Sequence, residues 1–157
     1  MKLTTALHRA GLAADGCGHD PEVSGITADS RQVRPRMIFA AIAGGRADGR
    51  AFIAQAVQQG ACAIVSTPDA CAAVRHAGHD IACIATDDPR HALSVIAAAL
   101  MPAMPGHVVA VTGTNGKTST VEFLRQIWQP QGHAAASIGT LGVISPTVPA
   151  LSGPSLP

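Results

Sequence analysis

The sequence has no tyrosine, and aromatic residues make up only 3% of its 157 residues. Charged residues are also scarce, at 13%, and they nearly balance, with 11 lysines and arginines against 10 acidic residues. This balance argues against nucleic acid as a partner, since DNA-binding domains usually carry a basic excess. Hydrophobic residues reach 47%, which is too much apolar material for a disordered chain, so we expect a folded protein with a substantial core.

Long apolar runs and an export signal are missing as well. No apolar stretch reaches the roughly 18 residues of a membrane span, and the first five residues lack the apolar segment of a signal peptide. The four cysteines, Cys17, Cys62, Cys71 and Cys83, form no C-x-x-C pair and match no common zinc module. We therefore expect a soluble cytoplasmic protein with no membrane partner and no disulfide framework.

Short apolar runs alternate with helix-like spacing over the first hundred residues. The runs predict strands at 23–28, 37–42, 61–65 and 81–85. Apolar residues three and four positions apart predict helices at 3–10, 52–57, 70–77 and 89–100, and Pro89 suits the first turn of the last helix. Strands that alternate with helices in this way indicate an α/β layer structure.

Two prolines and a glycine interrupt this pattern at 101–106 and mark a boundary. We assign residues 1–101 to a first domain, 102–106 to a linker, 107–142 to the start of a second domain and 143–157 to a tail. In the second domain we expect a strand at 107–111, a helix over 121–128 and a strand at 134–138. The tail is rich in proline and serine and has no periodicity, so we expect it to be disordered.

A glycine-rich loop follows the expected strand at 107–111 and precedes a helix, which is the arrangement of a phosphate-binding loop. Val111 stands where the general G-x-x-x-x-G-K-[ST] pattern has its first glycine. Lys117 would act as the catalytic residue by stabilising charge on a transferred phosphoryl group, and the Thr118 hydroxyl would reach a bound Mg²⁺. The candidate nucleotide-binding residues are Gly113, Thr114, Asn115, Gly116, Lys117, Thr118 and Ser119.

The loop at 112–119 resembles the ATP loop of the Mur ligase family, whose enzymes build the peptide stem of bacterial peptidoglycan; folylpolyglutamate synthetases share a similar loop. Three further segments resemble, in the same order, the family members that add the third stem residue. They are Asp29-Ser30-Arg31-Gln32-Val33, Asp48-Gly49-Arg50-Ala51-Phe52-Ile53 and Ser137-Ile138-Gly139-Thr140-Leu141-Gly142. The resemblance runs from about Leu3 to Gly142. It implies a Mur ligase N-terminal domain followed by the first strand, P-loop, helix and strand of a P-loop ATPase domain.

The resemblance also implies the ligands. The substrate would be the UDP-N-acetylmuramoyl dipeptide, UDP-N-acetylmuramoyl-L-alanyl-D-glutamate, and the cofactors would be ATP and Mg²⁺, in an amide-forming reaction with diaminopimelate or lysine. By the same resemblance, Ser30 would contact the uridine diphosphate and Ala28 would offer a backbone contact. Gly45, Arg46 and Ala47 would form the loop that lies over the nucleotide.

The sequence departs from the family pattern in two respects. Arg36 stands where the family usually has a glycine, and the later Mg²⁺ ligands, the modified lysine and the amino-acid pocket of the family have no counterpart in these residues. We therefore expect this fragment of the ligase to be inactive by itself. Two alternatives stay open. One is a non-catalytic nucleotide-binding module that acts through partner contacts. The other is a small P-loop kinase, which is disfavoured because Glu122 is the only carboxylate after Lys117.

Overall fold

The structure, a computed structural model, describes residues 1–13, 18–44, 48–101, 103 and 105–147. The chain divides into two compact units, Met1–Met104 (unit 1) and Pro105–Pro157 (unit 2), and each is described by itself. None of the helices in the described ranges has both the length and the apolar character that crossing a bilayer requires.

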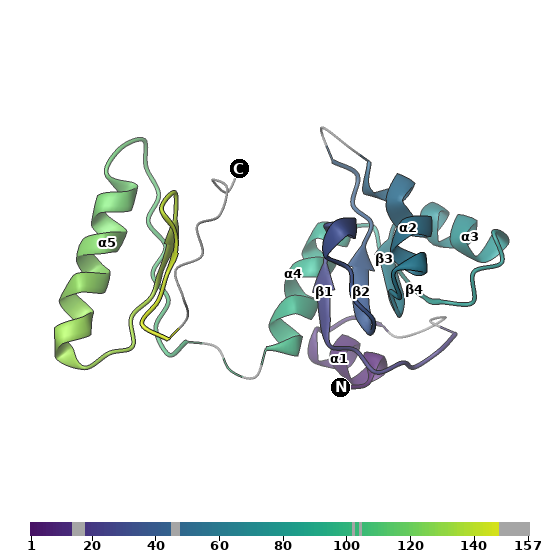
Figure 1. Cartoon of the computed structure of the whole chain (residues 1–157), viewed down its shortest axis with the longest axis horizontal. Helices are drawn as coiled ribbons and strands as arrows, with labels where there is room; N and C mark the ends of the chain where they lie inside the picture. The colour runs from purple at the N-terminus through teal and green to yellow at the C-terminus, as the bar shows by residue number, and fades with distance from the viewer. Residues whose placement is uncertain (14–17, 45–47, 102, 104, 148–157) are drawn as a thin grey trace. The chain divides into compact units, whose positions relative to one another are not determined.

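Unit 1 is built around a four-stranded parallel sheet (Figure 1). Its strands are β1 (Gly25–Thr27), β2 (Met37–Ala40), β3 (Ala63–Ser66) and β4 (Ala82–Ala85), and they lie side by side in the order of the sequence. Ile38 pairs with Ile26 on one side and with Ala63 on the other. The four strands predicted for the first domain are confirmed, although all four are shorter than expected and β3 begins two residues later.

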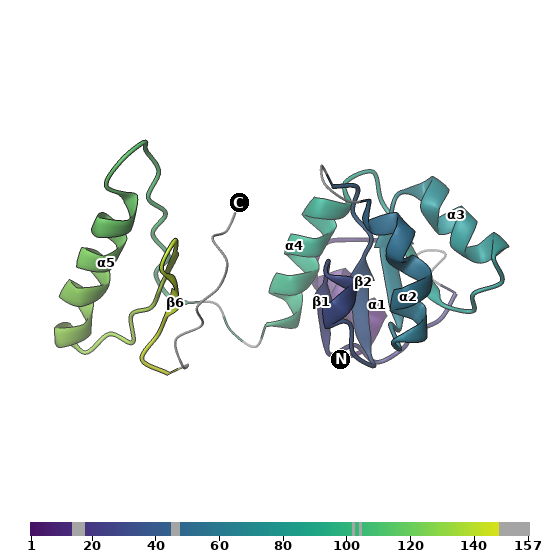
Figure 2. The same cartoon turned by 45° about the horizontal axis from the view of Figure 1, so that its top comes forward.

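Both faces of this sheet are covered by helices, because successive side chains of a strand point to opposite faces. Ile38 and Ala40 pack with the helices α1 (Leu3–Arg9) and α4 (Pro89–Leu100). Phe39, the residue between them, packs with α2 (Ile53–Gln58) and α3 (Pro68–His76). Figure 2 shows the helices around the sheet. This double covering explains why the strands read as continuous apolar runs rather than as an alternating pattern.

The cysteines of unit 1 belong to its packing. Cys71 on α3 and Cys83 on β4 are buried among apolar side chains, and Cys62 is half-buried. The Cys71 thiol lies 3.6 Å from the carbonyl oxygen of Ile84 and donates to it. Cys71 and Cys83 therefore pack as small core residues. In the described ranges, no group of three or more histidine, cysteine, aspartate or glutamate side chains that could hold a metal ion occurs.

Arg36 is the one non-glycine residue with a positive φ in the part of the chain that the structure describes, at 70°. Its carbonyl oxygen accepts hydrogen bonds from the backbone N–H of Ser24 at 2.8 Å and from the Ser24 hydroxyl at 3.2 Å. Its guanidinium pairs with Glu22 on the surface. The left-handed turn at this position explains why glycine, which lacks a β-carbon, is suited to it.

We expect the free energy of unfolding of the Arg36→Gly variant to be about 1 kcal/mol larger than that of the Arg36→Ala variant, because only glycine removes the strain of the left-handed conformation. Both variants lose the exposed ion pair with Glu22, so that loss cancels in the comparison. Urea unfolding followed by far-ultraviolet circular dichroism measures the difference. Equal stabilities of the two variants would show that the positive φ carries no cost in this turn.

Unit 2 holds the helix α5 (Lys117–Trp128) and an antiparallel pair of strands, β5 (Ser137–Gly139) and β6 (Gly142–Ile144). The strand expected at 107–111 is wrong, because these residues pair with no strand in the described part of unit 2. The chain reverses at Thr140 and Leu141, and Gly142, with φ 90°, begins β6, so β5 pairs with its immediate successor instead of a parallel neighbour. Residues 143–144, which we assigned to the tail, therefore belong to β6.

The apolar side chains of unit 2 are only partly covered. The exposed ones are Val108, Val109, Phe123, Ile127, Ile138 and Leu141. Leu124 and Trp128, on the same helix as Phe123 and Ile127, are half-buried. Helix α5 therefore packs along one side, where it contacts β5, and presents apolar side chains on another.

Candidate functional site

The glycine-rich loop of unit 2 ends directly at the start of α5. Gly116 is the residue before the helix and has φ 79°, and Gly113 has φ 144°, both in a range that glycine adopts without strain. The helix begins at Lys117 rather than at residue 121 as predicted, so Lys117 and Thr118 lie in its first turn. The backbone N–H groups of a first helical turn have no carbonyl partner within the helix, and they favour an anion.

Lys117 bends back over this loop. Its Nζ donates hydrogen bonds to the carbonyl oxygens of Gly113 at 2.5 Å and of Thr114 at 3.2 Å. The ammonium group is therefore positioned beside the loop backbone instead of extending into solvent. Carbonyl oxygens are neutral acceptors, so a phosphate group that approaches the loop would be a stronger partner for this charge.

A pocket of about 160 Å³ lies between the start of α5 and the β5–β6 hairpin. Lys117 and Thr118 line it, which brings together the two residues predicted to act on phosphate and metal. Asn115 and Ser119, which we also proposed for nucleotide binding, are exposed and lie outside this lining. The other lining residues are Val111, Val121, Glu122, Ser137, Ile138, Gly139, Thr140, Leu141 and Gly142.

Three polar residues of this pocket had no assigned role in the sequence. Thr140 Oγ1 lies 2.9 Å from Thr118 Oγ1, and the Ser137 hydroxyl donates to Glu122 Oε1 at 2.5 Å. Arg125 donates to the other Glu122 oxygen at 2.7 Å. The hydrogen bonds from Arg125 and Ser137 lower the pKa of Glu122, so its carboxylate is ionised and already paired. The sequence feature that could have pointed to Thr140 was the short Gly139-Thr140-Leu141-Gly142 turn that follows the helix.

In unit 1, Ser30 follows β1 and begins the 3₁₀ helix η1 (Ser30–Gln32). It is 8% exposed, and its hydroxyl donates to Gln55 Oε1 of α2 at 3.3 Å. Ala28 is exposed and lies between β1 and η1. The hydrogen bond to Gln55 connects the segment after β1 with the helix after β2. The predicted residues Ala28 and Ser30 therefore lie where the β1–β2 connection contacts the β2–β3 connection.

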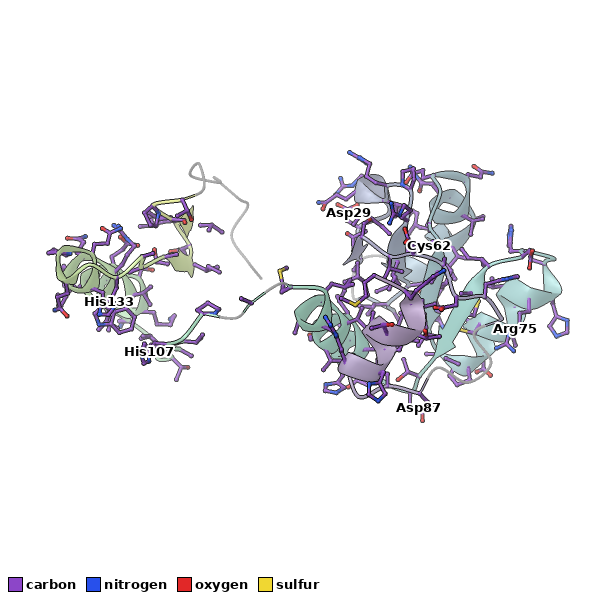
Figure 3. The ribbon with its side chains drawn as sticks, turned by 90° about the horizontal axis from the view of Figure 1, so that it is seen from below. Asp29, Cys62, Arg75, Asp87, His107 and His133 are labelled. Atoms are coloured by element: carbon purple, nitrogen blue, oxygen red, sulfur yellow. The ribbon has the colours of Figure 1, made fainter. Side chains whose placement is uncertain are left out.

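Asp29 lies on the surface of unit 1 (Figure 3) and caps η1. Its Oδ1 accepts from the backbone N–H of Arg31 at 3.0 Å and from Arg31 Nε at 2.9 Å, and its Oδ2 accepts from the same guanidinium at 2.8 Å. Asp29 and Arg31 therefore pair with each other. Ser30 is the member of this motif whose side chain turns inward.

The same cap recurs after β2. Asp48 Oδ1 accepts from the backbone N–H of Arg50 at 3.0 Å and from its Nε at 2.9 Å, where η2 (Gly49–Phe52) begins. A β-carbon on Gly49 would lie only 2.6 Å from the Ile42 carbonyl oxygen, and Asp48 bridges to Ala43. The two ends of this loop are thus held close together. Gly45, Arg46 and Ala47, predicted to lie over the nucleotide, fall outside the described residues.

Residues 22–105, more than half of the chain, match the model of the Mur ligase family, catalytic domain. The chain belongs to the Mur ligase family. Residues 111–152, which contain the loop, α5 and the hairpin, match the Mur ligase middle domain. The resemblance predicted from the loop and the Asp-Ser-Arg motif is confirmed.

Curated Mur ligases similar to this chain carry one name, UDP-N-acetylmuramoyl-L-alanyl-D-glutamate--2,6-diaminopimelate ligase. The one from Mesorhizobium japonicum is 49% identical over 127 residues, which cover 81% of this chain and 25% of the relative. The one from Bradyrhizobium diazoefficiens is 50% identical (80% and 24%), and the one from Brucella melitensis is 47% identical (85% and 27%). The chain spans about a quarter of the length of the curated relatives it matches.

Asp29 of this Mur ligase chain offers a direct test of the cap geometry. Hydrogen bonds from Arg31 lower the pKa of Asp29 to about 2. Because this pKa is depressed, the cap favours the folded state above the ordinary aspartate pKa, and its contribution is lost as the pH falls through about 2. We expect a carboxyl-carbon NMR titration of Asp29 to have its midpoint there. Arg31→Ala should return the midpoint toward its ordinary value, whereas Arg50→Ala should not move it.

Proposed function

We propose that the chain takes part in the ATP-dependent addition of diaminopimelate to UDP-N-acetylmuramoyl-L-alanyl-D-glutamate in peptidoglycan synthesis. In this proposal unit 2 holds the phosphates of ATP and unit 1 holds the uridine end of the UDP-muramoyl substrate. The observation that carries it is the 47–50% identity to relatives named for this reaction. The arrangement of Lys117 over its loop supports it.

The residues of unit 2 fit ATP and Mg²⁺. Gly113 and Gly116 let the loop backbone approach phosphate oxygens, and Lys117 adds a charge beside them. The Thr118 hydroxyl is a hard oxygen donor in the same pocket, which is the ligand type that Mg²⁺ prefers. When bound, Mg²⁺ would neutralise phosphate charge. Lys117 and Thr118 thus supply one side of the phosphate site, as the beginning of a P-loop ATPase domain would.

Unit 1 supports a site for the uridine diphosphate at the edge where β1 and β2 end. The carboxyl ends of neighbouring parallel strands meet at one edge, and loops at that edge are where α/β proteins bind ligands. The Ser30 hydroxyl and the Ala28 backbone follow β1, and the loop that carries residues 45–47 follows β2. Arg31 and Arg50 are engaged by aspartates, and from the family resemblance we assign the charge that would pair with the diphosphate to Arg46.

Titration of the full chain with UDP-N-acetylmuramoyl-L-alanyl-D-glutamate tests the substrate site. We expect amide NMR shifts at residues 28–31 and a two- to tenfold weaker affinity, by roughly one hydrogen bond, for Ser30→Ala. Ser94→Ala is the matched control, because Ser94 is an exposed serine of α4 in the same unit. Shifts confined to unit 2, or an equal loss in both serine variants, would contradict the assignment.

The small kinase considered from the sequence is less well supported. Such an enzyme needs a carboxylate that can act as a base or bind the metal. Glu122, the carboxylate that lines the pocket, is held by Arg125 and Ser137. The 47–50% identity to relatives named as ligases therefore favours the ligase over the kinase.

A further inference from the structure

We infer that Thr140 is a positioning residue for the phosphate and Mg²⁺ site. In this proposal it accepts a hydrogen bond from the Thr118 hydroxyl, which would leave a lone pair of Thr118 free for a bound Mg²⁺. This inference rests on the proposed function of unit 2 as an ATP-binding unit. It adds to that function a residue that lies outside the glycine-rich loop.

The hairpin holds Thr140 at a defined place beside the loop. Gly139 pairs with Gly142, so Thr140 and Leu141 form the tip between β5 and β6. Thr118 lies in the first turn of α5 and lines the same pocket as Thr140 and Lys117. The two hydroxyl oxygens are 2.9 Å apart, which is a direct hydrogen bond between segments separated by 22 residues.

The direction of this bond follows from the chemistry of a metal-bound hydroxyl. A threonine hydroxyl has one hydrogen to donate and two lone pairs. If a lone pair of Thr118 faces a cation, its hydrogen must point away from the cation and needs an acceptor. Thr140 Oγ1, which lies 2.9 Å from Thr118 Oγ1, can be this acceptor.

Among the described residues, the other polar groups that line the pocket make their hydrogen bonds elsewhere and none of them to the Thr118 hydroxyl. Lys117 carries only donors, and its Nζ bonds to the loop carbonyls. Ser137 donates to Glu122, and Glu122 also accepts from Arg125. Thr140 is therefore the acceptor that the hairpin provides for Thr118.

The affinity of the full 157-residue chain for ATP, measured by calorimetry with Mg²⁺ and again with EDTA, tests the inference. Thr140→Val keeps the shape of the side chain and removes the hydroxyl. We expect it to weaken Mg²⁺–ATP binding about three- to tenfold and to leave ATP binding in EDTA unchanged. Thr140→Ser should restore the wild-type affinity. Thr5→Val, at an exposed threonine of α1 in unit 1, is the matched control and should change neither value.

A second variant separates positioning from folding. Thr118→Val should lose at least as much Mg²⁺–ATP affinity as Thr140→Val, and the double variant should be no weaker than Thr118→Val, because both changes remove one hydrogen-bonded unit. Wild-type affinity in Thr140→Val, or equal losses with Mg²⁺ and with EDTA, would overturn the role of Thr140 alone. A wild-type chain that does not bind ATP, or binds it equally well after Lys117→Met, would overturn the proposed function and this inference with it.

Discussion

Replacing Lys117 by methionine should weaken ATP binding by about ten- to a hundredfold, as expected for the loss of a charged hydrogen-bond donor to phosphate. Methionine keeps the length and much of the bulk of the lysine stem but carries no charge. Lys117 is the one cationic side chain in the described lining of the pocket, and its Nζ is already held beside the loop by Gly113 and Thr114. Isothermal titration of the full chain with ATP and Mg²⁺ measures the change.

The sequence supplies a close control for this variant. Lys2 is the only other lysine, and it lies in unit 1, where its Nζ donates to the Asp20 carbonyl oxygen on the surface. Lys2→Met changes the net charge of the chain by the same amount as Lys117→Met. It should therefore leave the ATP affinity unchanged. Equal losses in the two variants would mean that ATP responds to net charge rather than to the loop.

Phe39→Ala should lower the free energy of unfolding of unit 1 by about 3–5 kcal/mol, the usual cost of deleting a buried phenyl ring. Phe39 is 0% exposed and lies at the centre of the face between β2 and the helices α2 and α3. Urea unfolding followed by far-ultraviolet circular dichroism measures the loss.

Phe52→Ala is the matched control, because it removes the same ring from a side chain of the same unit that is 40% exposed. Its cost should stay below about 1 kcal/mol. The single tryptophan, Trp128, lies in unit 2, so its fluorescence reports whether unit 2 stays intact in both variants. A Phe39→Ala protein no less stable than Phe52→Ala would contradict the packing described for the sheet.

The sheet of unit 1 was predictable because its strands are apolar runs bounded by turn residues. The face on which each residue lies was not, since both faces are covered and Ile38 and Phe39 are equally apolar. The hairpin of unit 2 was missed for a related reason. Strands of three residues carry too little alternation to reveal a partner, and Gly142 gives no sign of whether the next strand will be parallel or antiparallel.

The residues of the candidate sites also differ in whether the sequence alone could suggest them. Lys117 and Thr118, which the structure places in one pocket, could be proposed from the sequence because the phosphate-loop pattern is contained in a few consecutive residues. Thr140 and Gln55 could not, because each acts through a contact with a residue far away in the sequence. A hydroxyl in a short turn has many possible partners, and only the fold selects one.

The strand order β1-β2-β3-β4 has a consequence for how unit 1 is made. Each strand pairs with the one synthesised just before it, so the sheet can extend as the chain leaves the ribosome without waiting for a distant partner. The contact between α1 and α4 is the exception, since it joins the two ends of the unit. Leu3 and Leu7 therefore stay uncovered until α4 has emerged. Nascent chains halted before residue 89 should expose this apolar face to chaperones, and chains long enough for α4 to have left the ribosome should not.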